Sequence, residues 1–214
     1  MQIKELILET ASLQRTRLFY SRTLELPLIS ETEDAISFQA GRSVLTFKPA
    51  EDKKPFYHFA FNITNNKFSD SFEWINQKLD ILPVNNEMLI AGYDDWNAQS
   101  FYFHDNNGSI LEFIVRFDLP YHSEAPFSSD CIEEISEIGL VANYVPETAE
   151  DLNKEHGIPY FAKGPRLPDF IAMGDETGLV LVSQNKRGWV PTNKPAQKFP
   201  LTLVTGEDQV LRFS

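Results

Sequence analysis

The 214-residue chain is 42% hydrophobic and contains 17 Phe, so it has the apolar mass for a sizeable core and is neither disordered nor fibrous. Its net charge of −12 disfavours phosphate backbones and anionic lipid surfaces, so we predict no nucleic-acid partner and no membrane association. Cys131, the single cysteine, cannot form an internal disulfide, and the charged N-terminus lacks a secretory pattern. These features predict a cytoplasmic protein.

The first part of the chain predicts a strand, a helix and two further strands. Residues 5–9 alternate between apolar and polar side chains, which is typical of a strand. Ser12 is a suitable N-cap for a helix, and Pro27 marks the limit of that helix. Strand-like runs follow at residues 35–39 and 43–48. We assign residues 1–50 to a first unit.

The same order begins again at residue 57. Residues 57–63 alternate as a strand, and a helix with an apolar stripe of Phe68, Phe72, Ile75 and Leu79 follows. After a long loop, residues 101–103 and 110–117 predict two strands around an Asp105–Gly108 turn. The chain therefore contains an internal repeat, with a second unit at residues 56–118.

A third copy of the pattern is weaker. Residues 135–141 alternate poorly, residues 146–156 predict a helix that stops at Gly157, and residues 170–173 and 179–182 predict strands. We assign residues 131–214 to a degenerate third unit with a wrapping tail. We expect this unit to pack outside the first two or against the mouth of a cleft between them.

Three segments resemble the vicinal oxygen chelate superfamily, which includes glyoxalase I, bleomycin- and fosfomycin-resistance proteins and extradiol dioxygenases. Phe19-Tyr20 with Leu24-Glu-Leu26 is similar to its FY…LGL signature, residues 103–113 resemble its turn and last strand, and residues 58–63 resemble its opening strand. The resemblance implies an α+β fold of paired βαβββ modules that form a curved-sheet cleft, with a third partial module. Glu25 stands where the family has glycine, so we predict left-handed backbone there.

The resemblance also implies where a metal would bind. The family's ligand positions fall on Glu5, Thr46, His58 and Glu112, and the strand alternation directs all four away from the core. We predict that Glu5, His58 and Glu112 bind a divalent ion, a donor set that suits Zn, Ni, Co, Mn or Fe. Thr46 offers only a neutral hydroxyl. Glu112 or Glu5 could also carry a catalytic proton.

Three functions stay open on the sequence alone. The first is a metal-dependent lyase, isomerase or dioxygenase that acts on a small oxygen-chelating substrate. The second is a metal-free protein that sequesters a small molecule, as bleomycin-resistance proteins do, and Thr46 favours this alternative. The third is a non-catalytic scaffold. The sequence also leaves a homodimer open.

Overall fold

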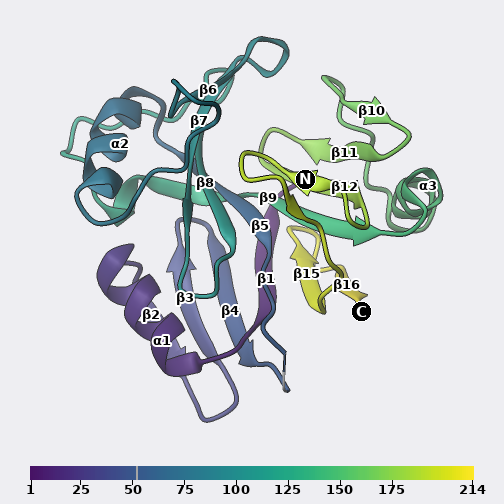
Figure 1. Ribbon diagram of the computed structural model, residues 1–214, viewed down its shortest axis with the longest axis horizontal. Helices are drawn as coiled ribbons and strands as arrows, with labels where there is room; N and C mark the ends of the chain where they lie inside the picture. Colours follow the sequence, from purple (N-terminus) through teal and green to yellow (C-terminus); the bar gives the residue numbers. More distant parts are fainter. Residues whose placement is uncertain (52) are drawn as a thin grey trace.

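The computed structural model describes residues 1–51 and 53–214 and contains two large mixed β-sheets (Figure 1). The six-stranded sheet has the order β16-β15-β1-β4-β3-β2, and the eight-stranded sheet has the order β10-β11-β12-β9-β5-β8-β7-β6. The helices are few and short, and α2 and α3 lie at opposite sides of the molecule. The predicted α+β class is confirmed. None of the helices among the described residues is long and apolar enough to cross a membrane.

The first unit has the predicted strand, helix and two strands, and it contains one further strand, at Leu28–Glu31, that the sequence did not predict. Ser12 caps its helix, since the side chain accepts a hydrogen bond from the backbone N–H of Arg15. The helix continues as a π-helix over Phe19–Thr23, which ends before Pro27. The elements are β1 (Ile3–Thr10), α1 (Leu13–Leu18), β2 (Leu28–Glu31), β3 (Ile36–Ala40) and β4 (Ser43–Pro49).

The second unit repeats this order, including the short edge strand after the helix, which the sequence did not predict here either. That strand, β6, lies in the region predicted as a long loop. The predicted turn is present, because one carboxylate oxygen of Asp105 accepts hydrogen bonds from the backbone N–H groups of Asn107 and Ser109, each 2.8 Å long. The elements are β5 (His58–Ile63), α2 (Phe68–Asn76), β6 (Ala91–Tyr93), β7 (Ala98–His104) and β8 (Ile110–Arg116).

The third unit packs neither outside the first two units nor at the mouth of a cleft between them, which corrects the prediction, because it shares a sheet with the second unit. Its first strand pairs antiparallel with β5, so the second and third units together form the eight-stranded sheet. The alternation was weak because nearly every residue of this strand is buried, on both faces of the sheet. The elements are β9 (Ile132–Ala142), α3 (Val145–His156), β10 (Arg166–Leu167), β11 (Phe170–Asp175) and β12 (Gly178–Gln184).

The end of the chain forms a small hairpin and then the last two strands of the six-stranded sheet. A small hairpin of β13 (Gly188–Trp189) and β14 (Lys194–Pro195) pairs with neither large sheet. The strands β15 (Leu201–Thr205) and β16 (Val210–Phe213) then return to the six-stranded sheet, where β15 pairs antiparallel with β1. The first unit therefore completes its sheet with the tail rather than with the second unit.

The two halves meet at the β3–β4 turn. Gly41 has φ 57° and lies against the backbone of Glu133 so closely that a Cβ atom would collide with it. The backbone N–H of Arg42 donates to the carbonyl oxygen of Glu133 at 2.8 Å. This contact fixes the first unit against β9 of the third.

The predicted left-handed residue is confirmed, because Glu25 has φ 56°. Glu25→Gly is therefore expected to raise the free energy of unfolding by about 1 kcal/mol, since glycine adopts this conformation without the clash of a Cβ atom. Equilibrium urea denaturation measures the change. The ion pair from Lys78 to Glu25 (2.7 Å) is half-exposed and contributes little.

Glu25→Ala is the matched control for this prediction. Alanine also loses the carboxylate but keeps the Cβ atom, so this variant should show no gain in stability. Equal stability of the alanine and glycine variants would contradict the assignment of strain to Glu25.

Candidate metal centre

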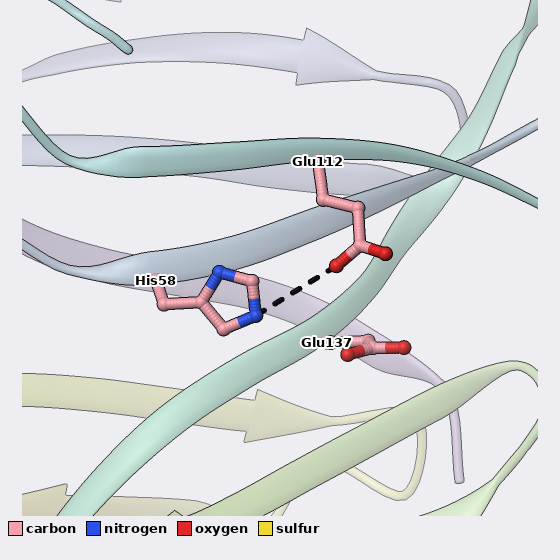
Figure 2. Close-up of side chains that lie close together, drawn as sticks. All are labelled: His58, Glu112 and Glu137. Atoms are coloured by element: carbon pink, nitrogen blue, oxygen red, sulfur yellow. Dashed lines mark ion pairs between the residues drawn. The ribbon is translucent and has the colours of Figure 1, made fainter. Parts of the chain in front are cut away.

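Three buried side chains converge on one face of the eight-stranded sheet (Figure 2). They are His58 at the start of β5, Glu112 on β8 and Glu137 on β9, and their ligand atoms all lie within 4.8 Å of one another. The side chains are 6%, 3% and 2% exposed, respectively. Side chains of this kind are rarely buried together without a partner or a function.

The strand register explains why these three residues meet. Ala60 is the cross-strand neighbour of Glu112 on one side and of Glu137 on the other. Neighbours across strands point to the same face, so the two carboxylates flank Ala60. His58 precedes Ala60 by two residues and therefore shares that face. The small side chain of Ala60 leaves the space between the three groups open.

His58 is held in the form that binds metals. Its Nδ1 atom lies 3.1 Å from the carbonyl oxygen of Ile110, and a carbonyl can only accept, so Nδ1 carries the proton. Nε2 then has a free lone pair, and it points toward the Glu112 carboxylate at 3.7 Å. Burial lowers the pKa of His58 to about 4, which keeps the ring neutral at physiological pH.

The two carboxyl groups differ in their surroundings. Glu137 forms an ion pair with the guanidinium of Arg116, which is 1% exposed. Burial raises the pKa of Glu137, and the positive charge of Arg116 opposes that shift. Burial and the negative charge of Glu137 raise the pKa of Glu112 to about 8. Glu112 is therefore the carboxyl that holds a proton near neutral pH in the metal-free protein.

A pocket of about 540 Å³ opens onto this group. Five aromatic side chains line its walls, and the hydroxyls of Tyr93 and Tyr102 are hydrogen-bonded to each other. Trp189, from the tail hairpin, packs against His58 with ring centroids 5.1 Å apart. Gly139 makes room for it, because a Cβ atom there would lie 2.6 Å from the indole. The aromatic wall residues are Tyr93, Trp96, Tyr102, Phe170 and Trp189.

Solved structures of known proteins share the fold of this protein over nearly the whole chain. A candidate dioxygenase from Bacillus subtilis matches 99% of this chain and 84% of its own, with a TM-score of 0.64 and 13% identity. A variant of glyoxalase I from Zea mays matches 99% of this chain and 91% of its own, with a TM-score of 0.56 and 12% identity. The chain has the vicinal oxygen chelate fold. No protein-family model matches the sequence, and no curated protein matches it.

Within this vicinal oxygen chelate fold, the structure brings together only two of the sequence-predicted ligands. His58 and Glu112 lie in the eight-stranded sheet, whereas Glu5 lies on β1 in the six-stranded sheet. There Glu5 accepts a hydrogen bond of 2.7 Å from the hydroxyl of Thr46. Glu5 and Thr46 are thus neighbours, as the repeat implies, but they lie in the six-stranded sheet, apart from His58 and Glu112. Glu5 does not join the candidate site.

Glu137 is the residue that the sequence reasoning missed. The first two units place their candidate ligands in the same register. Thr46 pairs with Ile7, two residues after Glu5, and Glu112 pairs with Ala60, two residues after His58. In the third unit, Leu181 pairs with Gly139, which follows Glu137 by two residues. When the repeat is extended to β9 and β12, Glu137 therefore takes the position of His58, and Leu181 takes the position of Glu112.

Proposed function

We propose that the protein binds a divalent metal ion through His58, Glu112 and Glu137 and acts on a small substrate that chelates the ion through adjacent oxygens. The observation that carries this proposal is the convergence of three buried donor groups at the inner end of the pocket. The donors fit an ion of the Zn, Ni, Co, Mn or Fe type, since one neutral imidazole and two carboxylates form a mixed nitrogen and oxygen set. Three protein ligands would leave coordination positions for a substrate.

The residues around the proposed ion would have separate roles. A divalent ion held there would stabilise negative charge that develops on a bound substrate oxygen. In the metal-free protein Glu112 can hold a proton, because burial and the charge of Glu137 raise the pKa of its carboxyl to about 8, and a bound ion would take the place of that proton. Arg116 and the Ile110 carbonyl orient Glu137 and His58, and the aromatic walls exclude water.

His58→Ala is expected to reduce bound metal to background, because it removes the single nitrogen donor of the group. The measurement is elemental analysis after the purified protein has been dialysed against each of the five ions. Circular dichroism checks that the variant is folded.

Glu5→Ala is the matched control for this test. It removes a carboxylate from the corresponding strand of the other sheet, so metal content should stay at the level of the parent protein. Stoichiometric metal in His58→Ala, or loss of metal in Glu5→Ala, would contradict the proposed site.

A metal-free binding protein is the second candidate, and two observations favour it. Leu181, which corresponds in register to Glu112, is apolar and cannot bind a metal. Glu137 is already paired with Arg116. A thermal-shift screen distinguishes the two functions. Small aromatic ligands that raise the melting temperature equally with and without metal would support sequestration, whereas a rise only with metal supports the first proposal.

A further inference from the structure

The charges around the pocket are unevenly compensated. Inside it, Glu137 is paired with Arg116. At the mouth, the Nε atom of Arg187 donates to a carboxylate oxygen of Asp169 at 3.2 Å. Two other charged groups that line the pocket, Asp94 and Asp95, are exposed, and in the described part of the chain neither carboxylate forms an ion pair or a side-chain hydrogen bond. The pocket mouth therefore carries uncompensated negative charge.

The turn that carries these aspartates is fixed in place. It is a 3₁₀ turn, Asp94–Trp96, closed by Asn97 at φ 48°. The side chain of Asn97 donates to the Asp118 carboxylate at 2.8 Å. The indole N–H of Trp96 donates to the carbonyl oxygen of Gly164 at 3.1 Å, so the turn is tied to the third unit. Asp94 and Asp95 are thus held at the mouth of the pocket by both units that form it.

The aromatic walls also favour positive charge. The guanidinium of Arg187 lies 4.5 Å from the ring centroid of Phe170, and that of Arg116 lies 4.9 Å from the ring centroid of Trp96. The faces of aromatic rings carry negative potential, which attracts cations. Tyr93 and Trp189 line the same pocket and receive no cation of their own among the described residues.

We propose that the pocket selects an aromatic ligand with a positively charged amine, whose ammonium group faces Asp94 and Asp95 at the mouth. The pocket volume of about 540 Å³ accommodates a substituted ring. The net charge of −12 adds a long-range field that attracts cations and repels anions. The inference rests on the proposed function only for the inner end of the ligand, where adjacent oxygens would meet a metal.

Three catechols that differ in the charge of the tail test the proposal. Dopamine, 4-ethylcatechol and 3,4-dihydroxyphenylacetate present the same pair of oxygens with a cationic, a neutral and an anionic tail. Titration into the Zn²⁺-loaded protein can be followed by calorimetry or by the fluorescence of Trp96 and Trp189. We expect dopamine to bind about tenfold more tightly than 4-ethylcatechol at low salt and the anion to bind most weakly.

Asp94→Asn with Asp95→Asn should abolish the preference for dopamine and leave the affinity for 4-ethylcatechol unchanged. The matched control is Glu33→Gln with Asp34→Asn, an exposed acidic pair that precedes β3 in the six-stranded sheet. This control changes the net charge equally and should keep the preference. A preference that survives the Asp94 and Asp95 substitutions, or that disappears in the control, would overturn the proposal.

Metal-free protein separates this inference from the proposed function. Phenethylamine and phenylacetate have the same kinds of tail but no chelating oxygens, so their binding does not require a metal. Selective binding of phenethylamine, lost in the Asp94 and Asp95 double variant, would support the inference even if no catechol bound in a Zn²⁺-dependent way. Equal binding of the two ligands, or tighter binding of phenylacetate, would refute it.

Discussion

Arg116→Met is expected to lower the free energy of unfolding of the metal-free protein by about 3–5 kcal/mol. The guanidinium is 1% exposed and forms the ion pair with Glu137, which is 2% exposed. Methionine has a similar length but no charge, so the variant leaves a buried carboxylate without its partner. Urea denaturation at neutral pH, in the presence of a chelator, measures the change.

The double variant Arg116→Met/Glu137→Met is the control that identifies the cause. It removes both charges and keeps the buried volume, and replacing a whole buried ion pair by apolar side chains is often neutral. Most of the lost stability should therefore return. A loss below about 1 kcal/mol in the single variant, or no recovery in the double variant, would show that the pair does not have this structural role.

Local signals were sufficient to predict the repeating units. The Ser12 cap, the Asp105–Gly108 turn and the Gly157 helix stop each depend on residues close together in the sequence, and each is present in the structure. The left-handed backbone at Glu25 was predictable because the family that the segment resembles has glycine at this position. These features determine the order of the elements within a unit.

The pairing of the units could not be predicted from the same information. Glu5 and His58 occupy corresponding positions on the opening strands of their units, and both point away from the hydrophobic core. Their surroundings differ because β1 pairs with β15, whereas β5 pairs with β9. Such pairing depends on contacts between residues 69 or more positions apart, and the alternation within a strand does not indicate which strands pair. For that reason Glu137 was missed and Glu5 was predicted in its place.

A substitution at Leu181 tests the candidate site directly. Leu181 on β12 corresponds in register to Glu112 on β8, and it lines the same pocket. We expect Leu181→His to raise the affinity for Zn²⁺ on the order of 100-fold, because it adds a neutral nitrogen donor to a site that has one imidazole and two carboxylates. Competition calorimetry against a chelator of known affinity measures this change.

Thr46→His is the matched control, because Thr46 holds the corresponding position in the first unit but lies in the other sheet. It should leave Zn²⁺ affinity unchanged.

At saturating metal, a 100-fold gain in Zn²⁺ affinity in Leu181→His corresponds to about 2.7 kcal/mol of additional metal-dependent stability. Leu181 is 3% exposed among apolar neighbours, so the metal-free variant should be less stable than the parent by about 1–3 kcal/mol. The two effects separate cleanly in thermal denaturation with and without Zn²⁺. No response to Zn²⁺ in either the parent protein or Leu181→His, with both proteins folded, would mean that no ion occupies the space between His58, Glu112 and Glu137, and the metal-free binding function would then be the better one.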